Sequence, residues 1–269
     1  MNSRIISAAV AVVLAVVVFI LHKTIVLEIV VALLTAGLLF EIFKATQCNK
    51  HWITMSLCCL YGMVVPFSRF IGAKFSVITL VFWLLVFASF LKEHKNMKID
   101  KLGIMIASTT LITFSMNSLL TLHKFTATHG LFLLILTLCG AWLADSGAYF
   151  AGTFFGKTKL CPTISPKKTV EGLVGGTITN GLIFLILALV YNKIDGVEFN
   201  YIYLFILGMA CSIIGLLGDL TASLIKRQYN IKDYGNIMPG HGGIMDRFDS
   251  VLFVAPFMAI MITNFSIFK

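Results

Sequence analysis

The sequence predicts an all-α, polytopic integral membrane protein with about nine transmembrane helices and a cytoplasmic N-terminus. Three observations support this fold class. Of the 269 residues, 58% are hydrophobic and only 12% are charged, a balance that a soluble domain of this size cannot bury. The apolar residues gather in runs of about 17 to 25 residues, the length that crosses a bilayer. The Lys and Arg residues are distributed unevenly among the loops between these runs.

Nine apolar runs are candidates for membrane spans. In chain order they are residues 5–21, 25–43, 52–67, 75–91, 102–120, 131–150, 173–191, 201–225 and 251–268. The first run follows Arg4, as the apolar part of a signal peptide would. Because no small-residue cleavage site follows it, we interpret this run as a retained helix.

The loop charges predict the orientation of the chain. With the N-terminus inside the cell, most of the 21 Lys and Arg residues fall on the cytoplasmic side, as the positive-inside rule requires. We therefore expect a bacterial-type inner (cytoplasmic) membrane protein with its polar stretch, residues 218–249, in the cytoplasm. Basic loops also favour contact with anionic membrane lipids, so the net charge of +9 does not indicate a nucleic-acid partner.

Residues 218–249 contain most of the polar groups that the apolar runs lack. The predicted span 201–225 includes Asp219, and an ionisable residue at membrane depth is a candidate functional residue. If this helix continues, Asp219, Ser223 and Lys226 lie on one face, at i, i+4 and i+7. A helix end with snorkelling basic side chains would explain Lys226 and Arg227, but it leaves Asp219 unexplained.

A Gly-rich segment follows, in which Pro239 and three glycines exclude a regular helix until about residue 244. Backbone N–H groups of such a loop can approach an anion closely. The candidate anion-binding residues are Gly240, His241, Gly242 and Gly243. His241 either touches phosphate or shapes the loop. Asp246 and Asp249 follow at i, i+3, a spacing at which one helical face presents two carboxylates to a hard divalent cation.

A second polar region covers residues 142–172. Asp145 is another acid inside an apolar run, and it is either catalytic or paired with a basic neighbour. Lys167 and Lys168 belong to a basic turn that would meet residues 218–249 if both lie on the cytoplasmic face. The alternative for these two lysines is ordinary topology-setting charge.

Small residues predict close helix contacts. Gly152 and Gly156 form one small-x-x-x-small pair, and Gly172 and Gly176 form another. Such a pair brings helices together either within one subunit or between the two subunits of a homodimer. The six cysteines are scattered without metal-site spacing, and we interpret them as small apolar residues.

Two blocks of residues resemble a known family. The first has Asp145, Ala148, Tyr149, Gly152, Gly156 and Lys157, followed by residues 165–172; the second has Ser223, Lys226, Arg227, Lys232, Asp233, Gly235, Pro239, His241, Gly242, Gly243, Asp246, Arg247 and Asp249. In this order and spacing they resemble the signature of phosphatidate cytidylyltransferases, also called CDP-diacylglycerol synthases. Met238 stands where the family usually has Leu, Ile or Phe, which is a conservative difference. The resemblance covers residues 142–269, whereas residues 1–130 match only as a hydrophobic profile.

The resemblance implies transfer of the cytidylyl group of CTP to phosphatidate, which gives CDP-diacylglycerol and pyrophosphate. For this reaction we assign Mg²⁺, as one or two cations, to Asp219, Asp246 and Asp249. We assign catalytic roles to Asp219, Lys226, Asp246 and Arg247. The expected substrate and phosphate contacts are Ser223, Arg227, Lys232, the loop Gly240 to Gly243, Lys167, Lys168 and Asp145.

The whole chain, residues 1–269, is expected to form one transmembrane domain, with N-terminal helices up to residue 130 and catalytic helices and loops in 131–269. Two other classes stay open. A transporter would spread its acids along a pathway in repeated halves, a pattern that this sequence lacks. CTP-dependent polyprenol or phytol kinases share distant features with the cytidylyltransferases. They differ in the moiety that reaches the lipid, which is phosphate for a kinase and CMP for a cytidylyltransferase.

Overall fold

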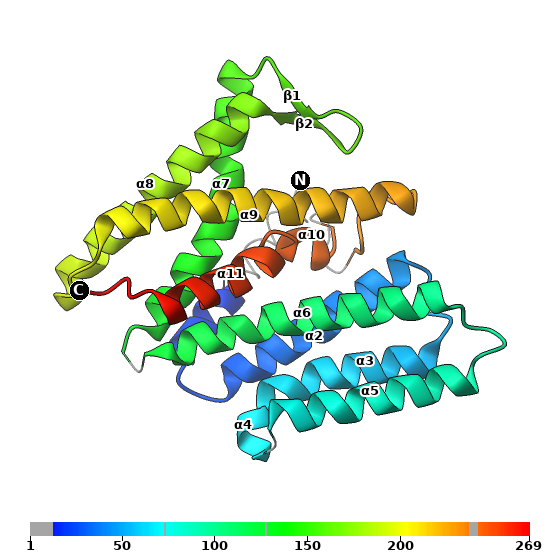
Figure 1. The fold of residues 1–269 in the computed structure, drawn as a ribbon. Helices are drawn as coiled ribbons and strands as arrows, with labels where there is room; N and C mark the ends of the chain where they lie inside the picture. Colours follow the sequence, from blue (N-terminus) through cyan, green and yellow to red (C-terminus); the bar gives the residue numbers. More distant parts are fainter. Residues whose placement is uncertain (1–12, 73, 127, 237–241) are drawn as a thin grey trace. The chain divides into compact units, whose positions relative to one another are not determined.

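The computed structural model describes residues 13–72, 74–126, 128–236 and 242–269 (Figure 1). Within these ranges the chain is mostly helical. It divides into two compact units: the first consists of Met1–Leu120 and Tyr229–Arg247, and the second of Thr121–Gln228 and Phe248–Lys269. That the units together form one transmembrane domain stays a prediction.

Seven helical segments among the described residues are long and apolar enough to cross a membrane. They are α2 (Val26–Ala45), Trp52–Ile71, α5 (Phe75–Lys92), α6 (Ile99–Phe125), α7 (Gly130–Phe155), α8 (Val170–Asp195) and α9 (Tyr201–Gln228). The segment Trp52–Ile71 is composed of α3 (Trp52–Val64), the 3₁₀ turn η1 (Val65–Phe67) and α4 (Ser68–Ile71). These seven correspond to the predicted runs from 25–43 to 201–225, so the expectation of a helical, polytopic membrane protein is confirmed.

The first and last predicted spans are not among these seven candidate membrane spans. Residues 13–20 are helical, Leu21 lies in a turn, and residues 5–12 of the predicted span 5–21 lie outside the described residues. In place of the span 251–268, the structure has α11 (Val251–Asn264), of 14 residues. At about 1.5 Å per residue this helix is roughly 21 Å long, shorter than the roughly 30 Å of a hydrocarbon core. Beyond it the chain is extended, and Phe268 forms a bridge with Phe199. The count of nine and the orientation of the N-terminus stay predictions.

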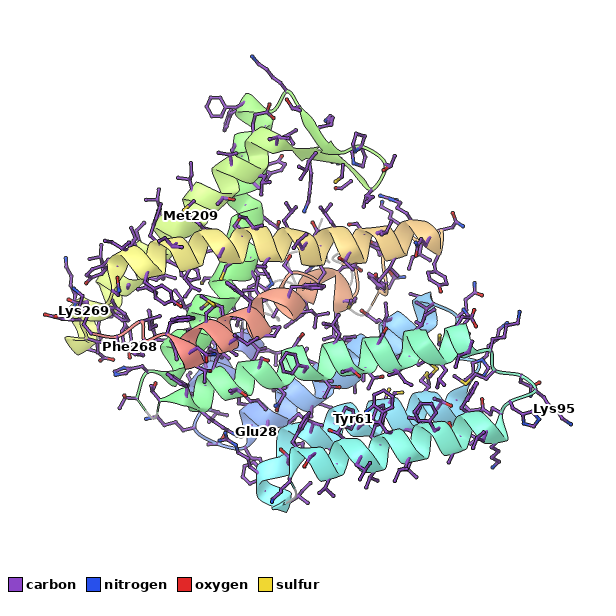
Figure 2. All side chains as sticks on the ribbon, in the orientation of Figure 1. Glu28, Tyr61, Lys95, Met209, Phe268 and Lys269 are labelled. Atoms are coloured by element: carbon purple, nitrogen blue, oxygen red, sulfur yellow. The ribbon has the colours of Figure 1, made fainter. Side chains whose placement is uncertain are left out.

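In the first unit, α3 packs between α2 and α5. Polar groups face one another inside this apolar packing, as they must when no water is near. The Thr54 and Ser89 hydroxyl oxygens are 2.6 Å apart. Tyr61, labelled in Figure 2, stacks on Phe82 with ring centroids 4.2 Å apart. The N-terminal turn of α6 is joined to the end of α2, because Lys101 Nζ donates to the Thr46 carbonyl at 2.7 Å.

In the second unit, α7, α8, α9 and α11 pack together, and a short hairpin connects α7 to α8 (Figure 1). The hairpin strands are β1 (Lys159–Cys161) and β2 (Ser165–Thr169), paired antiparallel. The sequence predicted only a basic turn there. One buried side chain joins three helices: Asn180 Nδ2, in α8, donates to the Gly140 carbonyl of α7 at 3.1 Å and to the Gly208 carbonyl of α9 at 2.8 Å.

The predicted small-residue contact lies within the chain, between α7 and α8. A Cβ added to Gly176 would lie 2.8 Å from the Ala144 carbonyl oxygen and 2.8 Å from Ala148 Cβ. A Cβ on Gly172 would lie 2.8 Å from the Ala148 carbonyl oxygen. Only glycine permits this approach. Of the two alternatives for Gly172 and Gly176, the structure therefore has the contact within the subunit. A homodimer stays a prediction that these glycines no longer support.

Replacing Gly176 with Ala should destabilise the second unit by on the order of 1–3 kcal/mol, because the new methyl group overpacks the α7–α8 contact. Gly103→Ala is the matched control, since nothing lies within 4 Å of a Cβ at this helical position of α6. We expect the thermal midpoint of the detergent-solubilised protein to fall for Gly176→Ala and to stay level or rise slightly for Gly103→Ala. Equal midpoints would contradict the close contact.

Candidate active site

An ion pair joins the hairpin to α9. The ammonium of Lys168, in β2, pairs with the carboxylate of Asp219, and the two side chains are only 23% and 21% exposed. The hairpin is attached to the start of α8, where the Thr169 hydroxyl caps the helix by accepting the Gly172 N–H at 3.1 Å. The Glu171 carboxylate accepts the Thr158 N–H at 3.1 Å. The expectation that the basic turn meets residues 218–249 is confirmed by this ion pair.

α9 places its polar residues as the helical spacing predicts. Because the helix continues to Gln228, Asp219, Ser223 and Lys226 share one face. The Ser223 hydroxyl donates to Asp219 Oδ1 at 3.3 Å. Arg227 is exposed and has a different neighbour: its Nε donates to the Ile164 carbonyl in the hairpin turn at 3.3 Å.

Asp249 lies in the turn before α11 and is 9% exposed. Its Oδ1 accepts the Ser250 N–H at 2.7 Å. Burial, followed by the negative charge of Asp219, raises the pKa of Asp249 to about 7. Lys226 and Asp145 also act on Asp249 electrostatically. The second unit therefore gathers three carboxylates, those of Asp145, Asp219 and Asp249, within electrostatic range of one another.

Two of these carboxylates, those of Asp145 and Asp219, line a cavity of about 450 Å³ inside the second unit. Its lining includes the charged residues Asp145, Lys159, Lys167, Lys168 and Asp219. It also includes the apolar residues Ala141, Ala144, Ala148, Leu160, Leu173 and Leu216. Tyr149, Thr153 and Ser212 add hydroxyl groups. Such a cavity suits a ligand with an anionic head and an apolar body.

The acidic residues of the second unit fit a divalent cation in donor chemistry and in charge. Carboxylate oxygens are the ligands that Mg²⁺ prefers, and a cation would relieve the repulsion from Asp219, which adds to the effect of burial in raising the pKa of Asp249. Among the described residues, no three Asp, Glu, His or Cys side chains are arranged closely enough to hold a metal. In this structure the ammonium of Lys168 neutralises Asp219 instead.

Asp246 and Arg247 belong to the first unit, in the short helix α10 (Met245–Phe248). Asp246 Oδ2 accepts the Tyr234 N–H at 2.9 Å and the Gly243 N–H at 3.1 Å. The expectation that one helical face carries both Asp246 and Asp249 is wrong. α10 ends at Phe248, and Asp249 lies in the turn that precedes α11.

The Gly-rich loop is described in part. Gly240 and His241 lie outside the described residues, while Gly242 has a φ of 86° that favours glycine. Lys232 is exposed in the preceding segment. In the described part of the loop, the Gly243 N–H donates to the Asp246 carboxylate, and the N–H groups of residues 244 and 245 donate to the Glu41 carboxylate. Anion binding by this loop stays a prediction.

Sequence reasoning missed Glu41, which lies in α2 and is 2% exposed. Its carboxylate accepts the Ile244 N–H at 3.1 Å and the Met245 N–H at 2.8 Å. A usable signal was present, because Glu41 interrupts the apolar run 25–43 as Asp219 interrupts 201–225. The criterion of an acid at membrane depth applies to both residues.

The fold and the site define a polytopic membrane protein with a cavity lined by both charged and apolar residues. The chain belongs to the Cytidylyltransferase family, whose model matches residues 2–265. This result confirms the family resemblance inferred from the two blocks of residues.

Three curated relatives illustrate the similarity. The phosphatidate cytidylyltransferase of Bacillus subtilis (strain 168) is 51% identical over 125 residues, which cover 46% of this chain and 45% of the relative. That of Haemophilus influenzae is 43% identical over 162 residues, or 59% of this chain and 56% of the relative. That of Rickettsia typhi is 38% identical over 197 residues, or 72% of this chain and 86% of the relative. The chain spans about half the length of the first two relatives.

The raised pKa of Asp249 makes a prediction about pH. The folded protein keeps a proton on Asp249 up to about pH 7, whereas the unfolded chain releases it near the ordinary value of 3.8. The contribution of this group to stability is therefore complete below the unfolded pKa and is lost as the pH rises through the folded pKa. In EDTA, thermal unfolding between about pH 5 and pH 8 should show wild type losing more stability than Asp249→Asn, by on the order of 1 kcal/mol per pH unit. If the stabilities of wild type and Asp249→Asn changed equally with pH, the raised pKa of Asp249 would be rejected.

Proposed function

We propose that this protein transfers the cytidylyl group of CTP to phosphatidate, producing CDP-diacylglycerol and pyrophosphate. The observation that carries the proposal is the cavity of the second unit, whose lining contains both charged and apolar residues. Membership of the Cytidylyltransferase family supports the class of reaction. The names of the three curated relatives support the substrates.

Phosphatidate is the substrate that this cavity suits. Its phosphate monoester would lie against Lys167 and Lys168, and part of its apolar body would lie against Leu173 and Leu216. Basic side chains make charge-assisted hydrogen bonds to phosphate oxygens, which hold the head group in one orientation. α7, α8 and α9 are long enough to cross a bilayer, so a lipid in the membrane would lie next to helices that line the cavity.

The reaction is an in-line displacement at phosphorus. An oxygen of the phosphatidate phosphate attacks the α-phosphorus of CTP and forms the new P–O bond. The bond between the α-phosphorus and the oxygen bridging to the β-phosphorus breaks, and pyrophosphate leaves. The attacking oxygen is already anionic, so the protein need not remove a proton from it. The main barrier is the repulsion between two anionic reactants, which positioned cationic groups lower.

Lys226, Arg227, Lys232 and Arg247 would contact the phosphates of either substrate, with the loop Gly240 to Gly243 and His241 next to the nucleotide. Ser223 would support Asp219 through its hydrogen bond. Asp219 and Asp249, with Asp246, would hold Mg²⁺, as one or two cations. When bound, Mg²⁺ neutralises phosphate charge and stabilises the leaving pyrophosphate. Asp145 would balance the charge of Lys168, which acts on it electrostatically.

The cellular location follows from the two substrates. CTP is soluble and phosphatidate stays in the bilayer, so the reaction requires a site at the membrane surface. The basic loops support an inner (cytoplasmic) membrane with the active site facing the cytoplasm.

The direct test supplies the purified protein, in liposomes containing phosphatidate, with CTP labelled either on cytidine or on the γ-phosphate. We expect the cytidine label to enter the lipid, in a reaction that requires Mg²⁺. Entry of the γ-phosphate label would identify a CTP-dependent lipid kinase. No transfer of either label by a folded sample would reject both enzymes and leave transport or binding.

Asp219→Asn should lower Mg²⁺-dependent transfer at least about 100-fold, because it removes a proposed metal ligand and the partner of Lys168. Asp195→Asn is the matched control, since Asp195 ends α8 and does not line the cavity. Both variants should insert into the membrane like wild type. Full activity of purified Asp219→Asn would remove this residue from the site.

Lys167→Met should raise the KM for phosphatidate about tenfold and change the KM for CTP less, because it removes one charge-assisted contact to the lipid phosphate. Lys157→Met is the control, as Lys157 is exposed and does not line the cavity. An equal rise in both KM values would argue against assigning the cavity to the lipid.

A further inference from the structure

We propose that Glu41 is a positioning residue that holds the segment Gly243–Asp246 in its working conformation. Its two carboxylate oxygens accept two successive backbone N–H groups, those of Ile244 at 3.1 Å and Met245 at 2.8 Å. These N–H groups stand at the start of α10, where helical N–H groups have no partner within the helix. A side chain from α2, about 200 positions earlier in the chain, therefore supplies the missing acceptors.

The surroundings of Glu41 are shaped to receive a carboxylate. Cβ atoms added to Gly235 or Gly243 would collide with its oxygens, at 2.5 Å from Oε2 in the case of Gly243. On the preceding turn of α2, a Cβ on Gly37 would come within 2.8 Å of Ile244 Cδ1. Gly235 and Gly243 thus leave room for the Glu41 carboxylate, and Gly37 leaves room for the side chain of Ile244. The close fit on both sides indicates a built contact.

The ionised carboxylate of Glu41 has two acceptor oxygens, one for the Ile244 N–H and one for the Met245 N–H. An amide in its place offers one acceptor oxygen and turns an NH₂ group toward the second N–H. A buried donor without an acceptor is costly, so the segment would move away from such a side chain. The position of residues 243–246 therefore depends on the chemistry of residue 41 as well as on its size.

The same segment sets the position of Asp246. Asp246 Oδ2 accepts the Gly243 N–H at 3.1 Å and the Tyr234 N–H at 2.9 Å, so the carboxylate of Asp246 is attached to backbone that Glu41 holds. This inference rests on the proposed function, in which Asp246 binds metal and Arg247 binds phosphate. Glu41 itself contacts neither substrate in this scheme. It acts through the orientation of α10.

The test compares Glu41→Gln with Glu28→Gln in the full-length protein. Both residues are buried acids of α2, 2% and 4% exposed, and Glu28 is labelled in Figure 2. We expect Glu41→Gln to lower kcat for cytidylyl transfer on the order of 10- to 100-fold, with a smaller change in KM for CTP and phosphatidate. Amide hydrogen exchange of the peptide containing Ile244 and Met245 should become faster. Glu28→Gln should leave the kcat and this exchange rate as in wild type.

A second variant guards against misfolding of Glu41→Gln. In Gly235→Ala the new methyl group displaces the Glu41 carboxylate while residue 41 stays Glu, so this variant should lose kcat as Glu41→Gln does. The double mutant Glu41→Gln/Gly235→Ala should lose no more kcat than either single variant. Faster exchange with unchanged kcat, or unchanged exchange in both variants, would overturn the proposal. If wild type transfers no cytidylyl group, the proposed function fails, while the exchange rates still decide whether Glu41 holds the segment.

Discussion

The ion pair between Lys168 and Asp219 is the interaction on which the second unit depends most directly. A carboxylate placed within an apolar helix is costly unless a cation and hydrogen bonds compensate it. Here the cation comes from β2 and the hydrogen bond from Ser223, one turn along α9. The hairpin reaches Asp219 because the Thr169 cap and the bond between Glu171 and Thr158 attach it to the start of α8. The hydrogen bonds at the start of α8 thus hold Lys168 where it can pair with Asp219 of α9.

Close helix packing provides the space next to this pair. Gly172 and Gly176 bring the backbone of α8 against α7, and Asn180 joins both helices to α9 through two carbonyl oxygens. In an apolar medium such hydrogen bonds replace the hydrophobic effect as the source of specificity. Because these contacts hold the helices together at defined points, a cavity can persist where small residues such as Ala141 and Ala144 line it. Its mixed lining is what supports a lipid phosphate as substrate.

The first unit also contains buried or half-buried carboxylates, and backbone N–H groups compensate them there. Its buried acid, Glu41, is satisfied by two backbone N–H groups of the Gly-rich segment, and Asp246 is satisfied by those of Tyr234 and Gly243. Of the N–H groups that the sequence suggested for a bound anion, that of Gly243 is thus occupied by the carboxylate of Asp246. Glycines at 235 and 243 are needed here because a larger side chain would collide with Glu41.

The sequence by itself determined the membrane class, seven of the helical spans, the family, and the shared face of Asp219, Ser223 and Lys226, because hydropathy and helical period are local properties. Only the tertiary structure decided that Lys168 pairs with Asp219, that Gly172 and Gly176 contact a helix of the same chain, and that Glu41 binds the backbone of residues 244 and 245. Each of these joins residues that are far apart in the sequence. The sequence alone also placed Asp246 and Asp249 on one helix, and the chain turns between them because α10 ends at Phe248. Where a helix stops and which distant group compensates a buried charge depend on packing, which no local pattern contains.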